Sequence, residues 1–154
     1  MMRPSAEQKG LALDVDAHGS VQVLADSAAL HRILHNLVAN AIKFTESGSV
    51  RVRVYAVAPE EEGGARGIIE VTDTGIGIEE SFLPYLFEPF QQQSKGMARA
   101  HEGAGLGLTI VKRLTEMLNG TLTVRSQEGV GTTCRLALPL SESALRHVVG
   151  RQGD

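Results

Sequence analysis

Apolar residues recur along the chain with two different spacings, and these spacings predict where strands and helices lie. Alternation at every second position predicts strands at 11–15, 21–23, 50–54, 68–72, 122–124 and 134–138. Steps of three and four residues predict two amphipathic helices, one at 30–44 after an N-cap at Asp26 or Ser27, and one at 107–118 that ends at Asn119-Gly120. We therefore expect an α/β fold, an α+β two-layer sandwich whose mixed sheet is covered on one face by helices.

The chain is expected to hold one domain and two short ends. Residues 1–10 are interpreted as a linker or the end of a preceding helical region, residues 11–140 as the domain, and residues 141–154 as a tail. The glutamate and glycine run at 60–64 predicts a solvated hairpin loop. Between 73 and 107 the periodicity is lost, apart from a short apolar stretch at 82–90, which is typical of a lid or binding loop.

Composition narrows the classes of partner. The chain has 154 residues, of which 42% are hydrophobic, so it can bury a core, and its formal net charge of −3 disfavours nucleic acid and anionic membranes. The single Cys134 cannot form an internal disulfide, so we expect a reducing, cytoplasmic setting and a small core residue. No apolar run is long enough to cross a bilayer, and we expect no membrane contact by this domain. This expectation leaves room for an inner-membrane anchor elsewhere in the parent protein.

Three polar residues share one face of the first long helix. Asn36, Asn40 and Lys43 lie at i, i+4 and i+7, and two interior asparagines cost roughly 1 kcal/mol of helix propensity relative to alanine. One interpretation is a solvated polar face. The other is that the amide oxygens complete the shell of a hard cation such as Mg²⁺, while the ammonium group meets a phosphate oxygen.

A carboxylate and two glycines follow the strand at 68–72. In the Asp73 to Ile78 segment, Gly75 and Gly77 permit a positive φ and the close approach of a ligand. A capped strand end is the alternative. A carboxylate at this position can accept a hydrogen bond from an exocyclic amine. Adenine has this amine where guanine has a keto oxygen, so the carboxylate would select ATP over GTP.

The second long helix opens with glycines at alternate positions. Gly103, Gly105 and Gly107 expose backbone N–H groups near the positive end of the helix dipole, which favours phosphate. The segment is neither a Walker loop nor the dinucleotide fingerprint, because the following residues and the glycine spacing differ from both. A glycine-rich turn without a ligand is the alternative.

In this order and spacing, the motifs resemble those of the ATP-binding catalytic domain of sensor histidine kinases, a superfamily that includes gyrase, mismatch-repair ATPases and a heat-shock chaperone. Residues 36–45 (NLVANAIKFT) look like the N box, 73–78 (DTGIGI) like the first glycine box, 87–90 (FEPF) like the F box and 103–108 (GAGLGL) like the second glycine box. The resemblance runs from about Lys9 to Pro139. It implies the Bergerat α/β sandwich, with ATP and Mg²⁺ as cofactors.

The resemblance also implies a role for each site residue. Asn40, with Asn36 beside it, would bind Mg²⁺, Lys43 a phosphate, and Asp73 the adenine amine, while Thr133 would help to hold the adenine end. Phe87 and Phe90 are interpreted as a hydrophobic plug at the lid base, and Arg99, better placed than Lys95, as a lid arginine; Arg99 joins Asn40 and Lys43 as a candidate catalytic residue. The remaining residues expected at the nucleotide are Gly75, Gly77, Ile78, Phe90, Gly103, Gly105, Leu106, Gly107 and Leu108.

The missing residues favour phosphoryl transfer over hydrolysis. Related ATPases place a water-activating glutamate four residues before the metal-binding asparagine, where this chain has Asn36. None of its five histidines, His18, His31, His35, His101 and His147, stands in the family's phosphoacceptor context. We therefore expect a monomeric catalytic domain that transfers the γ-phosphate of Mg·ATP to a histidine on a separate dimerisation domain, with a response regulator receiver downstream. The alternatives are a regulatory module that binds nucleotide without transfer and a serine kinase of the anti-sigma type.

Overall fold

The structure, a computed structural model, describes residues 3–17, 26–57, 66–85 and 108–140, apart from the side chains of residues 3–5, 82, 84 and 85. Two helices and the first strand come early in the chain: α1 (Arg3–Gln8), β1 (Ala12–Ala17) and α2 (Ser27–Lys43). They are followed by β2 (Ser49–Val57), β3 (Arg66–Asp73), the 3-10 helix η1 (Glu80–Tyr85), a helix at 108–117, β4 (Thr121–Gln127) and β5 (Gly131–Pro139).

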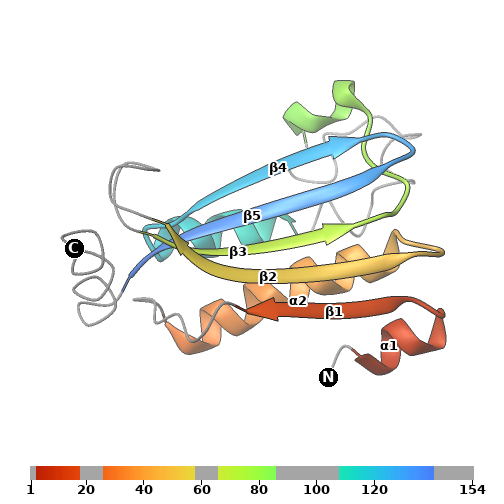
Figure 1. Cartoon of the computed structure of the whole chain (residues 1–154). Helices are drawn as coiled ribbons and strands as arrows, with labels where there is room; N and C mark the ends of the chain where they lie inside the picture. Colours follow the sequence, from red (N-terminus) through yellow and green to blue (C-terminus); the bar gives the residue numbers. More distant parts are fainter. Residues whose placement is uncertain (1–2, 18–25, 58–65, 86–107, 141–154) are drawn as a thin grey trace, which may run out of the picture.

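The five strands form one mixed sheet in the order β1-β2-β3-β5-β4. β1 runs parallel to β2, and the other neighbouring pairs are antiparallel. A parallel pair needs a crossover connection, and α2 lies in the segment that joins β1 to β2. Figure 1 shows α2 and the helix at 108–117 behind the sheet. The expected fold, an α/β sandwich with helices on one face of a mixed sheet, is confirmed.

The main hydrophobic core lies between the sheet and the two long helices. Its fully buried members include Ile33 from α2, Val50 from β2, Val111 from the second long helix and Leu136 from β5. The apolar stripes that predicted the helices are therefore the faces that pack on the sheet. Asp26 is the N-cap of α2, because its Oδ1 accepts a hydrogen bond of 3.0 Å from the Ala29 N–H, and the helix ends at its C-cap Phe44, as expected.

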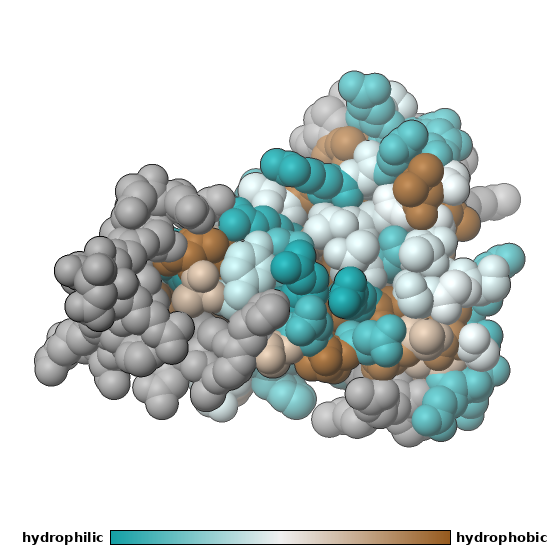
Figure 2. All heavy atoms as spheres, viewed as in Figure 1, coloured by the Kyte–Doolittle hydropathy of each residue, from teal (hydrophilic) through white to brown (hydrophobic). Residues whose placement is uncertain are grey.

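The opposite face of the sheet is polar in its middle. Glu70 of β3 lies between Arg53 of β2 and Arg135 of β5, with nitrogen–oxygen distances of 3.8 and 3.7 Å, and it accepts a hydrogen bond from the Tyr55 hydroxyl. Figure 2 shows this face, with hydrophilic residues over the strands. The alternation of valine and arginine in β2 therefore gives one buried and one wet face, as predicted from residues 50–54.

The start of the chain, which is interpreted as a linker or the end of a preceding helical region, contains a short helix. Residues 3–8 form α1, and Ala6 is 1% exposed and belongs to the same core as the strands. The Lys9 ammonium group donates hydrogen bonds of 2.8 and 3.1 Å to the carbonyl oxygens of Ile42 and Lys43. These carbonyls lie in the last turn of α2, where the helix dipole favours a cation. Residues 3–10 thus pack on the domain rather than lying apart from it.

Several expectations concern residues that the structure does not describe. They are the strand at 21–23, the loop at 60–64, the F box, the lid residues, Gly103 to Gly107 and the tail at 141–154. β2 and β3 pair antiparallel from Val50↔Asp73 to Val57↔Arg66.

Candidate functional site

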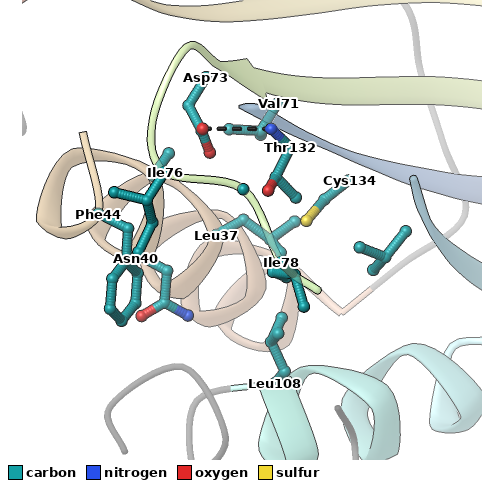
Figure 3. Close-up of a pocket in the computed structure, with 13 residues that line it drawn as sticks. Leu37, Asn40, Phe44, Val71, Asp73, Ile76, Ile78, Leu108, Thr132 and Cys134 are labelled. Atoms are coloured by element: carbon teal, nitrogen blue, oxygen red, sulfur yellow. Dashed lines mark hydrogen bonds between the residues drawn. The ribbon is translucent and has the colours of Figure 1, made fainter. Parts of the chain in front are cut away.

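A pocket opens between the sheet and the two long helices. It has about 540 Å³ of space, a volume that includes its open mouth. Figure 3 shows side chains from α2, β3, β5 and the helix at 108–117 arranged around it. Its lining residues are Leu37, Asn40, Ala41, Phe44, Val71, Asp73, Ile76, Gly77, Ile78, Leu108, Val124, Thr132 and Cys134.

Asp73 is the last residue of β3 and contributes a carboxyl group to the pocket lining. Its Oδ1 accepts hydrogen bonds from the Gly75 N–H at 2.9 Å and the Thr132 N–H at 3.3 Å, the second drawn in Figure 3. Both donors bind the same oxygen, so Oδ2 has no hydrogen-bond partner among the described residues. Burial raises the pKa of Asp73, and the two backbone N–H groups offset part of that rise. The carboxylate is thus held rigidly with one acceptor oxygen left for a ligand.

Asn40 presents a buried amide to the same pocket. Its Nδ2 is buried and has no hydrogen-bond partner among the described residues. A buried unpaired amide group costs about 1–3 kcal/mol, so its retention points to a ligand that pairs with it. Rotation of the amide by half a turn brings its oxygen to the same position, and a neutral oxygen suits Mg²⁺, which takes few protein ligands and keeps water and substrate phosphates. The residue therefore fits the expected cation.

The described residues contain no group of three or more histidine, cysteine, aspartate or glutamate side chains that could hold a metal ion.

Glycine is required at positions 75 and 77 for two different physical reasons. Gly77 has a φ of +73° and lines the pocket, so it adopts the conformation expected of it. Gly75 is not among the residues with positive φ. A Cβ there would instead collide with the Phe44 carbonyl oxygen and lie 2.8 Å from Thr45 Oγ1. The close approach at Gly75 is therefore made by the end of α2, which brings Asn40 and Asp73 to one pocket.

Thr133, which is expected at the adenine end, does not line the pocket, whereas its neighbour Thr132 does. Thr133 pairs with Thr72 across β5 and β3, and their hydroxyl oxygens are 3.1 Å apart. Thr132 and Cys134 line the pocket, and successive strand residues point to opposite faces, so Thr133 points away from it. Thr132, whose register partner is Asp73, occupies the place that was expected of Thr133.

The other expected residues fall into three groups. Ile78 and Leu108 are buried and line the pocket. Asn36 is half-buried and Lys43 is exposed, and neither is among the lining residues. The Lys43 ammonium nitrogen lies 5.4 Å from the centroid of the Phe44 ring, close to the pocket wall. Phe90, Arg99, Gly103, Gly105, Leu106 and Gly107 lie outside the described residues.

Most of the remaining lining is apolar and was not predicted individually. Leu37, Ala41 and Phe44 come from α2, and Val71, Val124 and Cys134 from the sheet. Burial raises the pKa of Cys134 to about 12, with a smaller contribution from the charge of Asp73, so the thiol is neutral at pH 7. Cys134 packs against the core, as expected. An apolar pocket with one carboxylate and one amide suits a flat heteroaromatic ring with a polar edge.

The fold and this pocket define a nucleotide-binding α/β sandwich domain. Residues 25–142 match the model of the histidine kinase-, DNA gyrase B-, and HSP90-like ATPases. The chain belongs to this family, and the resemblance to the catalytic domain of sensor histidine kinases is confirmed.

Individual relatives agree with this assignment. The autoinducer 2 sensor kinase/phosphatase LuxQ of Vibrio parahaemolyticus is 45% identical over 145 residues, which are 91% of this chain and 17% of that protein. Full-length ShkA, solved in complex with AMPPNP, has a TM-score of 0.75 and 34% identity, and the match covers 91% of this chain and 28% of that one. The mycobacterial sensor histidine kinase MprB has a TM-score of 0.72 and 29% identity, with 90% of each chain covered.

The comparisons support ATP binding and a kinase role for a domain of this kind. The chain spans less than a fifth of the LuxQ relative, in which it matches one part of a longer protein. Among the described residues, no helix is both long enough and apolar enough to cross a membrane.

Proposed function

We propose that this chain binds Mg·ATP in the pocket and donates the γ-phosphate to a histidine on a separate helical domain of its parent protein. The observation that carries the proposal is the arrangement of Asp73 in the apolar pocket, where two backbone N–H groups hold Oδ1 and leave Oδ2 to accept from an adenine amine. Thr132 lies beside it and replaces Thr133 in the proposed adenine site.

The triphosphate end is assigned to the α2 side of the pocket. There the Asn40 amide lacks a partner, and the exposed Lys43 ammonium group lies at the end of the same helix. Asn40 would hold Mg²⁺, which neutralises charge on the phosphates when bound, with Asn36 as its neighbour on the helix. Lys43, Arg99 and the glycines of the second glycine box are proposed to contact the phosphates, with Leu106 and Phe90 beside them.

The proposed transfer needs positioning and charge neutralisation more than a general base. A neutral imidazole nitrogen attacks the γ-phosphorus, the bond to the bridging oxygen breaks, and ADP leaves. Asn36 cannot take a proton from water, so this site does not favour hydrolysis as its main activity. The chain's own part is to orient the nucleotide so that the γ-phosphate meets the incoming imidazole.

The proposed partners follow from the acceptor that the chain lacks. None of its histidines stands in a phosphoacceptor context, so a helical dimerisation and phosphoacceptor domain of the same parent supplies the histidine, and a response regulator receiver takes the phosphate next. We assign the domain to the cytoplasm, and this assignment is compatible with a membrane anchor in another part of the parent protein. We expect the isolated domain to be a monomer.

Incubation of the chain with γ-labelled ATP, Mg²⁺ and a cognate helical hairpin tests the proposal. We expect label on the hairpin that is lost in acid and kept in base, as phosphohistidine is. Tight ATP binding without label on the hairpin would contradict transfer and favour the regulatory module. An acid-stable product would instead favour a serine kinase.

A further inference from the structure

Ser126 of β4 connects two walls of the proposed adenine site, although it does not line the pocket itself. Its Oγ accepts a hydrogen bond of 2.8 Å from the Ile78 N–H, which belongs to the turn after Asp73. The same oxygen is 2.8 Å from Thr132 Oγ1 and 3.1 Å from the Gly131 carbonyl oxygen. One hydroxyl therefore touches the first glycine box and the strand residue that faces Asp73.

The hydroxyl protons of Ser126 and Thr132 can be arranged in two ways. A serine hydroxyl has one proton and two lone pairs, and the Ile78 N–H uses one lone pair. If Ser126 donates its proton to Gly131, Thr132 donates its own proton to Ser126 and shows only lone pairs to the pocket. If Ser126 donates to Thr132 instead, the proton of Thr132 is free to point into the pocket. The pair can thus present either an acceptor or a donor beside Asp73.

Adenine would use the second arrangement. Its polar edge carries an exocyclic amine, which donates, next to a ring nitrogen, which accepts. Asp73 Oδ2 supplies the acceptor for the amine, and a donating Thr132 hydroxyl supplies the matching donor. The Thr132 N–H already binds Asp73 Oδ1 at 3.3 Å, so the two groups are adjacent.

We propose that Ser126 is a positioning residue for purine recognition, whose hydroxyl orients the Thr132 hydroxyl as a donor toward the ring nitrogen beside the adenine amine. This inference rests on the proposed function and deepens it, because it concerns the same pocket. Ser126 acts on the base through the Thr132 hydroxyl. It touches no nucleotide.

The test combines a protein variant with a ligand variant, both measured by calorimetry on the full chain with Mg²⁺. Ser126→Ala removes the hydroxyl, and 1-deaza-ATP carries a C–H in place of the ring nitrogen beside the amine. A single net hydrogen bond corresponds to about a five- to tenfold change in Kd. We expect Ser126→Ala to weaken ATP by that factor and to leave the weaker binding of 1-deaza-ATP unchanged. In the transfer assay KM for ATP rises while kcat stays the same.

Two further variants separate positioning from general stability. Ser126→Thr keeps the hydroxyl and should restore ATP affinity, while Thr123→Ala, on the exposed face of the same strand, should bind ATP like the unchanged chain. Equal losses for ATP and 1-deaza-ATP, or no loss for ATP, would overturn the inference even if Ser126→Thr does not fold. If the unchanged chain binds no ATP, the proposed function fails instead.

Discussion

Replacement of Asp73 by asparagine tests the proposed base contact while almost preserving shape. The new side chain keeps one oxygen, which can still accept from the Gly75 and Thr132 N–H groups at the position of Oδ1. Its other terminal group becomes an NH₂ where the carboxylate had Oδ2. A donor then faces the donating amine of adenine, so the contact is lost.

The size of the effect follows from the type of bond that is removed. A hydrogen bond to a charged group contributes about 1.5–3 kcal/mol, and 1.36 kcal/mol is tenfold in affinity, so Asp73→Asn should weaken ATP about ten- to hundredfold. GTP, whose keto oxygen can accept from the new NH₂, should lose less, so the preference for ATP over GTP should narrow.

The same substitution should not destabilise the empty protein. Burial raises the pKa of Asp73, so the folded state holds the proton more tightly than the unfolded state. The contribution of the Asp73 carboxyl to stability therefore falls as the pH rises above its ordinary pKa of 3.8 and through the raised pKa of the folded state. Because asparagine carries no charge, the melting temperature of Asp73→Asn at pH 7 should equal or exceed that of the unchanged chain.

Calorimetry with ATP and GTP, together with thermal unfolding, measures both effects. Asp14→Asn, on the exposed part of β1, is the matched control and should change neither affinity nor melting temperature. In acid, protonation of Asp73 removes its acceptor oxygen. The ratio of the ATP affinity of the unchanged chain to that of Asp73→Asn should therefore fall as the pH is lowered. ATP binding by Asp73→Asn that is as tight as binding by the unchanged chain would refute the proposed base contact.

Three more substitutions test the parts around Asp73. Asn40→Ala should abolish most Mg²⁺-dependent nucleotide affinity without lowering the free energy of unfolding, because it removes a buried unpaired amide; normal binding would refute the assignment. Gly75→Ala should destabilise the fold by about 1–3 kcal/mol in urea unfolding, because its methyl group meets the Phe44 carbonyl oxygen and Thr45 Oγ1, and an unchanged midpoint would contradict this contact. Lys9→Ala should lower the free energy of unfolding by about 0.5–1.5 kcal/mol, because the Ile42 and Lys43 carbonyls lose the ammonium donor of Lys9; equal stability would show that the contact adds nothing.

The regular elements could be predicted because their burial follows a period. The stripe that contains Ile33, Leu37 and Ile42 is the buried face of α2, and the alternating valines of β2 face the core. The packing of α1 could not be predicted in this way, because one small residue, Ala6, enters the core from a polar segment. The strand order also depends on long-range pairing, which no local period specifies.

The site was predictable where a motif fixes backbone conformation. Asp73 and Gly77 lie at the pocket because they end a strand and turn the chain. Thr133 was expected at the adenine end, and Thr132 lines the pocket. Local sequence does not tell which of two adjacent threonines faces the helices, because the register with β3 decides it. The role of Gly75 was missed for a similar reason, since its close neighbour is the end of α2, about thirty residues earlier in the chain.

Amide chemical-shift mapping during titration with Mg·ATP tests most directly whether nucleotide binds in this pocket. We predict saturable shifts centred on the N–H groups of Gly75, Ile78 and Thr132. In Asp73→Asn the same shifts should need about ten- to hundredfold more ATP. No shift at millimolar ATP, or shifts confined to the Arg53, Glu70 and Arg135 face of the sheet, would contradict the account.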